Sequence, residues 1–118
     1  PKIAKAFTTK ASELELGNLE VYREYNSIHY VCEVYYKLMI SEAHSEIVNI
    51  ASGKTHSLVE IISLFENQSN HSVSIKINPL FIRKNETFRL AGDIKKLSTL
   101  IDLPKNNSIK DVITSFLL

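Results

Sequence analysis

The sequence predicts a small α/β domain with a short, partly parallel sheet and about four to five helices. The prediction rests on two observations: helical and strand-like periodicities alternate along the chain, and capping signals mark several helix starts. The chain has 118 residues, of which 44% are hydrophobic and 23% charged. It carries no internal repeat and no linker rich in Pro, Gly or Ser. We therefore expect residues 1–118 to form a single domain around one core.

The N-terminal third contains a predicted helix, two predicted strands and a second predicted helix. Pro1 can begin the first helix, and residues 14–16 and 19–22 alternate around Gly17, which predicts two short strands joined by a turn. A helix then begins near Ile28, with Asn26 or Ser27 as its cap. Its predicted buried face consists of Ile28, Val31, Cys32, Tyr35 and Met39.

The middle of the chain alternates strand and helix. Residues 46–50 are a predicted strand that ends at residues 51–53. Ser57 and Glu60 form a capping box, in which the serine oxygen accepts the glutamate amide and the glutamate carboxylate reaches back. This box begins a helix through Phe65, and residues 73–77 then alternate as a strand that ends before Pro79.

The C-terminal third begins with an irregular segment. Residues 80–91 fit neither period and carry the positive charges of Arg83, Lys84 and Arg89. We expect a helix from Asp93, its N-cap, through residue 101. A final helix begins at a second capping box, formed by residues 108 and 111.

Composition excludes several classes of function. The net charge of +1 argues against a nucleic-acid or membrane-surface module. The single cysteine, Cys32, excludes an internal disulfide and suits a reducing compartment, so we expect a cytoplasmic location. The three glycines, Gly17, Gly53 and Gly92, lie far apart. The chain therefore has neither of the two glycine-rich loops that cradle the phosphates of a dinucleotide or of ATP.

No residue is predicted to be catalytic and none is predicted to bind a metal. The histidines His29, His44, His56 and His71 lack the spacing of metal-binding motifs, and one cysteine cannot form a thiolate cluster. A Ser/His/Asp triad stays open, because its members are distant in sequence, although no G-x-S-x-G motif supports one.

Two segments carry residues suited to binding a nucleoside diphosphate. Arg23 lies at the end of a predicted strand, close to the turn at Gly17, and can clamp a phosphate. In the irregular segment, Arg83 can fork onto a diphosphate while Glu86 accepts the hydroxyls of a ribose. The alternative is that Arg83 and Glu86 pair with one another or face water.

Several stretches of the sequence resemble one enzyme family. These are L-G-N-L-E-V-Y-R-E-Y at residues 16–25, V-N-I-A-S-G at 48–53 and S-L-x-E at 57–60. They look like the C-terminal part of extended short-chain dehydrogenase/reductases of the NAD-dependent epimerase/dehydratase family. The most specific stretch, N-P-L-F-I-R-K-N-E-T-F-R-L-A-G-D at residues 78–93, closely resembles a run in GDP-6-deoxy-4-keto-mannose reductases. A looser version occurs in GDP-mannose 4,6-dehydratases.

The resemblance implies a division of labour between two domains. In such enzymes an N-terminal Rossmann domain, missing from this chain, holds NAD(P) and a Tyr-x-x-x-Lys pair. The smaller C-terminal domain binds the nucleotide end of the sugar nucleotide. By motif position, Arg23 and Arg83 match residues that contact the diphosphate, Glu86 matches the carboxylate at the ribose, and Gly17 matches the turn beside the nucleotide. One departure is His29, where relatives often carry an acidic residue.

The implied function is that of the nucleotide-sugar-binding C-terminal domain of an NAD(P)-dependent reductase, with GDP-4-keto-6-deoxymannose as the expected substrate. Such a piece is inactive alone. The alternatives are a dehydratase or epimerase of the same family and a freestanding binding module without enzymatic activity. The expected partners are a GDP-linked hexose, the missing Rossmann domain and a second copy in a homodimer, with no nucleic acid and no membrane. We expect the isolated piece to self-associate, because a face made for the cofactor domain would be uncovered.

Overall fold

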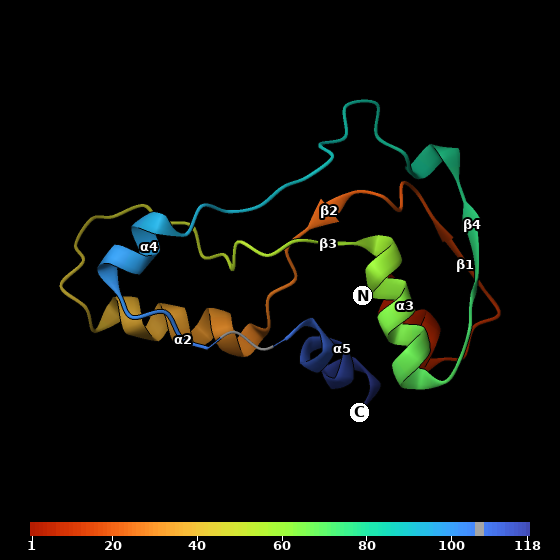
Figure 1. Ribbon diagram of the computed structural model, residues 1–118, viewed down its shortest axis with the longest axis horizontal. Coiled ribbons are helices and arrows are strands. Elements are labelled where there is room, and N and C mark those ends of the chain that lie inside the picture. The colour runs from red at the N-terminus through yellow and green to blue at the C-terminus, as the bar shows by residue number, and fades with distance from the viewer. Residues whose placement is uncertain (106–107) are drawn as a thin grey trace.

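The fold was obtained as a computed structural model, which describes residues 1–105 and 108–118 (Figure 1). In these residues the elements follow one another as α1 (Lys2–Thr8), β1 (Glu13–Leu16), β2 (Tyr22–Arg23), α2 (Ile28–Met39), β3 (His56–Ser57), α3 (Leu58–Ser69), β4 (Ser74–Ile77), the 3₁₀ helix η1 (Pro79–Phe81), α4 (Lys95–Leu100) and α5 (Ile109–Leu117). Strands β1 and β4 pair in parallel, whereas β2 and β3 pair antiparallel. The predicted α/β class with a short, partly parallel sheet is confirmed.

Most of the core lies in one lobe, which we call the large lobe and which consists of α1, α3, α5, β1 and β4. The three helices pack against one another beside the two strands (Figure 1). Strand β1 places Leu14 and Leu16 in this core, and the rings of Phe7 and Phe65 stack there with their centroids 5.2 Å apart. Burial of such apolar surface is the main term that stabilises the lobe.

A second cluster forms what we call the small lobe, which consists of α2, α4 and residues 46–51. Its buried residues are Tyr30, Val34 and Leu97. The expectation of one core is therefore wrong. The whole molecule measures 51 × 36 × 16 Å with a radius of gyration of 16.7 Å, whereas a compact domain of this length has a radius of about 13–14 Å. The chain is thus a thin slab with two separate clusters.

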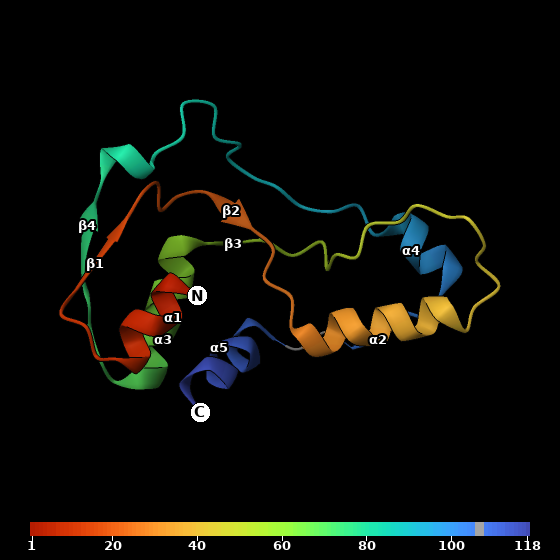
Figure 2. The ribbon, with the colours of Figure 1, turned by 180° about the vertical axis from the view of Figure 1, so that it is seen from behind.

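The lobes are joined by extended segments that run side by side through β2, β3 and residues 87–91 (Figure 2). Tyr22 donates its amide to the carbonyl of Phe88 at 2.8 Å, and Leu90 donates its amide to the carbonyl of Tyr22 at 3.1 Å. The ring of Tyr22 lies under the guanidinium of Arg89, 4.4 Å from its centroid. These contacts anchor the irregular segment to β2.

The predicted capping boxes are confirmed. The hydroxyl of Ser57 accepts the amide of Glu60, and the Glu60 carboxylate accepts the amide of Ser57. The box at Ser108 and Asp111 has the same form. Helix α4 begins later than predicted, with residue 94 as its N-cap, although Oδ1 of Asp93 accepts the amide of residue 95 at 2.8 Å.

The predicted strand pairings differ from those observed. The strands near residues 14–16 and 19–22 do not pair with each other, because β1 pairs with β4 and β2 pairs with β3. Leu14 faces Ile75 in the register, so the apolar side of β1 stays on the large-lobe core. Residues 46–50 form no strand, because no other segment of the described chain lies in register beside them.

The predicted buried face of α2 is also wrong. Tyr30 and Val34 face the small-lobe cluster, whereas Tyr35, which the sequence analysis assigned to the core, is 63% exposed. Ile28 and Met39 are exposed as well. The helix has two apolar sides, and the described chain covers only the side that meets α4 and residues 48–50.

Candidate functional site

Two of the predicted site residues meet where β2 ends. Arg23 is the last residue of β2, and its Nη2 lies 3.8 Å from Oε1 of Glu86, with the side chains 28% and 18% exposed. Nη1 of Arg23 donates to the carbonyl oxygens of Tyr22 at 2.8 Å and Thr87 at 2.9 Å. The arginine is therefore held by both its own strand and the segment that carries Glu86.

Glu86 has an acceptor atom without a partner. Its Oε2 is buried and accepts no hydrogen bond from any described residue. A buried carboxylate oxygen left unpaired costs free energy, so its presence at a surface loop suggests a donor that arrives from outside. Arg83, three residues earlier, is exposed and forms no ion pair or hydrogen bond within the described chain. The pairing of Arg83 with Glu86 that the sequence left open is not formed.

Gly17 packs against η1, at the start of the segment that carries Arg83 and Glu86. A Cβ atom at Gly17 would lie 2.6 Å from the carbonyl oxygen of Phe81, a distance that backbone packing does not allow. The missing side chain thus lets η1 pack against the end of β1. Helix η1 ends two residues before Arg83. Lys2 adds a cation–π contact to Phe81, with its Nζ 4.6 Å from the ring centroid. The structure therefore gives Gly17 a packing role, and its contact with a nucleotide stays a prediction.

Glu24 is a site residue that the sequence analysis did not identify. Its Oε2 accepts the amide and the hydroxyl of Ser52 at 2.6 and 3.0 Å, and its Oε1 accepts the amide of Gly92 at 2.6 Å. Burial alone would raise the pKa of this carboxyl, but these hydrogen bonds and one from Asn26 lower the pKa below its ordinary value. Glu24, the residue after Arg23, therefore joins the end of β2 to the segments that carry Ser52 and Gly92.

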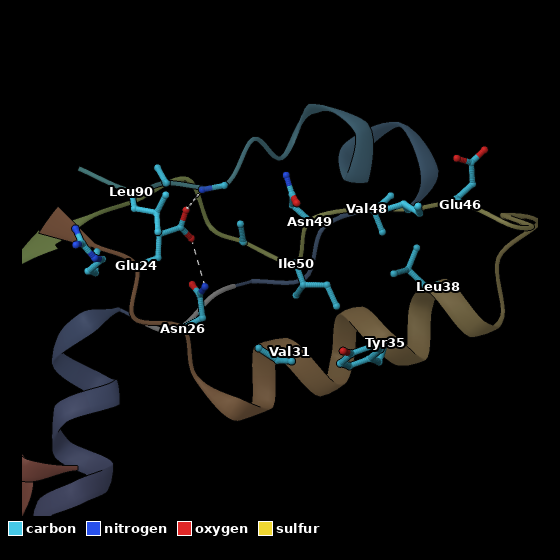
Figure 3. A pocket seen from close by; sticks show the side chains of 15 residues that line it. Glu24, Asn26, Val31, Tyr35, Leu38, Glu46, Val48, Asn49, Ile50 and Leu90 are labelled. Carbon is cyan, nitrogen blue, oxygen red and sulfur yellow. Dashed lines mark hydrogen bonds between the residues drawn. The ribbon is translucent and has the colours of Figure 1, made fainter. Parts of the chain in front are cut away.

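A cavity of about 1060 Å³ extends from this junction into the small lobe (Figure 3). Arg23, Glu24 and Asn26 form its polar end. The rest of its wall is mainly apolar and comes from α2, residues 46–51 and residues 90–92. A guanidinium at one end of an open, largely apolar cavity suits an anionic group attached to a larger ligand.

The described residues form neither a metal centre nor a membrane-spanning helix. Residues 1–105 and 108–118 contain no cluster of three His, Cys, Asp or Glu side chains that could hold a metal ion. Within the same ranges, no helix has both the length and the apolar character needed to cross a bilayer.

Comparisons with known proteins identify relatives of this chain. No family model matches the chain. The chain is 34% identical over 101 residues to GDP-6-deoxy-D-talose 4-dehydrogenase from Aggregatibacter actinomycetemcomitans, a match that covers 86% of this chain and 34% of the relative. It is 23% identical over 108 residues to GDP-6-deoxy-D-mannose reductase from Pseudomonas aeruginosa, covering 92% of this chain and 36% of that protein.

The fold is shared with a solved enzyme structure. The structure of RMD from Pseudomonas aeruginosa complexed with NADPH superposes with a TM-score of 0.86 at 22% identity, covering 99% of this chain and 41% of that chain. This chain spans about a third of the length of the curated relatives it matches. The resemblance to part of an extended short-chain dehydrogenase/reductase is confirmed.

Proposed function

We propose that this chain binds the nucleoside diphosphate of a GDP-linked sugar, as the C-terminal, substrate-binding part of an NAD(P)-dependent reductase. The expected substrate is GDP-4-keto-6-deoxymannose. The observation that carries the proposal is the Arg23–Glu86 pair, in which Oε2 of Glu86 has no partner in the described chain, three residues after the exposed Arg83. The names of the two curated relatives, both of which refer to GDP-linked sugars, support the choice of nucleotide.

The chemistry of these side chains matches the parts of such a ligand. Arg83 has five N–H donors and no partner in the described chain, so its whole fork is open to a diphosphate. Glu86 can accept hydrogen bonds from the ribose hydroxyls through Oε2, which has no partner in the described chain. The ion pair with Arg23 holds the Glu86 side chain in place.

The cofactor would be held by another domain. A Cβ atom on Gly17 or Gly92 would meet the chain's own atoms, so neither glycine opens a cradle for a pyrophosphate. Gly53 stands alone in a turn. The residues present therefore do not fit NAD(P), and we expect residues 1–118 to be inactive alone. The N-terminal Rossmann domain that the family resemblance implies would hold NAD(P), and the RMD structure that shares this fold is a complex with NADPH.

The test is calorimetric titration of the 118-residue chain with GDP-mannose. Arg83→Ala is expected to raise the dissociation constant at least tenfold, because a charge-assisted bond to phosphate is worth about 1.5–3 kcal/mol. Lys84→Ala, the matched control, removes one positive charge from the neighbouring residue and should change the constant less than threefold. Equal losses in the two variants, or no binding to the unmodified chain, would contradict the proposal.

A second variant separates the ribose contact from general charge effects. Glu86→Gln keeps the size of the side chain but weakens acceptance from hydroxyl donors, so affinity for GDP-mannose should fall about tenfold. An affinity that rises instead, through loss of repulsion between the carboxylate and the diphosphate, would show that Glu86 does not contact the ribose. Competition by UDP-glucose at equal strength would contradict the preference for a GDP-linked sugar.

A further inference from the structure

A cavity of about 480 Å³, which we call the Tyr22 cavity, lies on the side of β2 and β3 opposite to Arg23. Tyr22 of β2 faces Ser57 of β3, and Arg23 faces the preceding residue of β3. Partners in a ladder point to the same side of a sheet, and successive residues of a strand point to opposite sides. Tyr22 and Ser57 line the Tyr22 cavity, whereas Arg23 lines the cavity that leads into the small lobe. The Tyr22 cavity is therefore separate from the proposed nucleotide site.

Two aromatic rings form one wall of this cavity. The rings of Tyr22 and Phe88 have their centroids 5.4 Å apart and are tilted by 56°. Phe88 is 61% exposed, so its ring is open to a ligand. The faces of aromatic rings attract cations. The structure contains one such contact already, because the guanidinium of Arg89 lies 4.4 Å from the centroid of the Tyr22 ring.

Two carboxylates complete the polar part of the wall. Glu20 is exposed, and its carboxylate forms no ion pair or hydrogen bond within the described chain. Glu60 uses Oε2 to accept the amide of Ser57 at 3.1 Å and to contact Nδ1 of His56 at 3.3 Å. Its Oε1 has no partner in the described chain. Among the described residues that line the cavity there is no lysine or arginine, so its charge is negative.

We propose that the Tyr22 cavity binds a guanidinium group on an alkyl stem, as carried by an arginine side chain. A guanidinium is planar, stacks on aromatic rings and can donate to two carboxylates from one fork. An ammonium group is more strongly hydrated and lacks the planar fork. The volume of the cavity lies within the range of about 300–1,000 Å³ that is typical of small-ligand sites.

Other classes of ligand fit these residues less well. A neutral apolar ligand would take the free oxygens of Glu20 and Glu60 out of water without supplying a donor, which costs free energy. An anion would be repelled by both carboxylates. A cation with a flat, weakly hydrated head satisfies the rings and the carboxylates together.

The experiment is an NMR titration of the isotope-labelled 118-residue chain with N-acetylarginine amide. The matched control ligand is N-acetylcitrulline amide, which has nearly the same shape but no charge. We expect shift changes at the amides of residues 20, 22, 59 and 88, and an affinity at least tenfold weaker for the citrulline compound. Equal affinities for the two compounds, or no shift changes at these amides, would overturn the inference.

Variants of the chain test the two parts of the wall. Glu20→Gln removes a charge and Phe88→Leu removes a ring while keeping an apolar side chain, and each should weaken binding about threefold. The controls are Glu42→Gln and Leu80→Ala, exposed residues outside the cavity, which should leave the affinity unchanged. Unchanged affinity in both Glu20→Gln and Phe88→Leu would also overturn the inference.

Two further titrations identify the source of the ligand and the independence of the site. Tighter binding of N-acetylarginine amide than of agmatine identifies an arginine of another polypeptide as the occupant, whereas the reverse identifies a free guanidinium compound. Either order supports the site. Saturating GDP-mannose should leave the affinity for N-acetylarginine amide unchanged, because the two sites lie on opposite sides of β2. Competition between the two ligands would overturn the inference, while failure of GDP-mannose to bind would contradict only the proposed function.

Discussion

Nη2 of Arg23 lies 3.8 Å from Oε1 of Glu86, so an ion pair joins the end of β2 to a loop far along the sequence. The same guanidinium donates to the carbonyl oxygens of Tyr22 and Thr87. Three groups on two segments are thus held by one planar side chain. This arrangement positions the loop that contains Arg83 relative to the cavity that Arg23 lines.

Replacing Arg23 by lysine should destabilise this junction. Lysine keeps the charge but cannot reproduce the fork that reaches both carbonyl oxygens and the carboxylate. We expect the free energy of unfolding to fall by about 1–2 kcal/mol. Urea denaturation followed by circular dichroism measures the change. Arg83→Lys is the matched control, because Arg83 has no partner in the described chain, and it should leave the midpoint unchanged. Equal midpoints for both variants would contradict the prediction.

Glu24→Gln should weaken the contact between the segments of β2, Ser52 and Gly92. The carboxylate accepts two backbone amides, and a neutral amide oxygen accepts them less strongly. We expect a loss of about 1–3 kcal/mol at pH 7. The control is Glu42→Gln, an exposed residue without a partner in the described chain, which should change stability by less than about 0.5 kcal/mol.

The same carboxylate should make stability depend on pH in the acid range. Its pKa in the folded chain is lower than the ordinary value that it has when unfolded. Its contribution is therefore fully present above the ordinary pKa and is lost as the pH falls through the folded value. Urea midpoints measured from pH 7 to pH 3 should converge for the unmodified chain and Glu24→Gln. A gap between them that stays constant across this range would show that Glu24 titrates normally.

Gly17→Ala should displace η1. The added methyl group would overlap the carbonyl oxygen of Phe81, and backbone atoms cannot move aside as the end of a side chain can. We expect a cost of about 1–3 kcal/mol together with weaker GDP-mannose binding. Leu80→Ala serves as the control on the same segment, because Leu80 is 90% exposed and its truncation should change stability little. A Gly17→Ala chain as stable as the control would exclude the close approach.

Tyr30→Phe should loosen the small lobe. The buried hydroxyl of Tyr30 donates to the carbonyl of Ala51 at 2.8 Å, and its removal leaves that oxygen unpaired. The expected loss is about 1 kcal/mol. Tyr36→Phe removes the same atom from an exposed ring on the same helix and should have no measurable effect. Thermal denaturation of both variants distinguishes the buried hydroxyl from the exposed one.

The features that the sequence predicted correctly are local ones. Both capping boxes depend on residues three apart, such as Ser57 and Glu60, so the sequence contains the whole interaction. The strand ending before Pro79 and the position of Arg23 at a strand end are also local. The contribution of Glu24 could not be predicted in this way, because its partners Ser52 and Gly92 are distant in sequence.

The errors share a physical cause. Helix α2 has two apolar sides. Helical periodicity identifies apolar positions, but it could not show which of the two sides the chain itself would cover. Likewise, the sequence predicts a strand at residues 46–50, yet a strand is stable only with a neighbour in register. In both places the sequence pattern indicates a contact, burial of one helix face or pairing of a strand, that the described chain does not form.

The division of the thin molecule into two hydrophobic clusters affects how it unfolds on heating. The small lobe buries only Tyr30, Val34 and Leu97 in its cluster, against ten residues in the cluster of the large lobe. Regions with less buried apolar surface open at lower free energy. We expect the small lobe to melt first, so that the α-helical signal of α2 is lost while the stacked rings of Phe7 and Phe65 still report a folded core. Unfolding would then proceed in two steps, and a single melting temperature would not describe it.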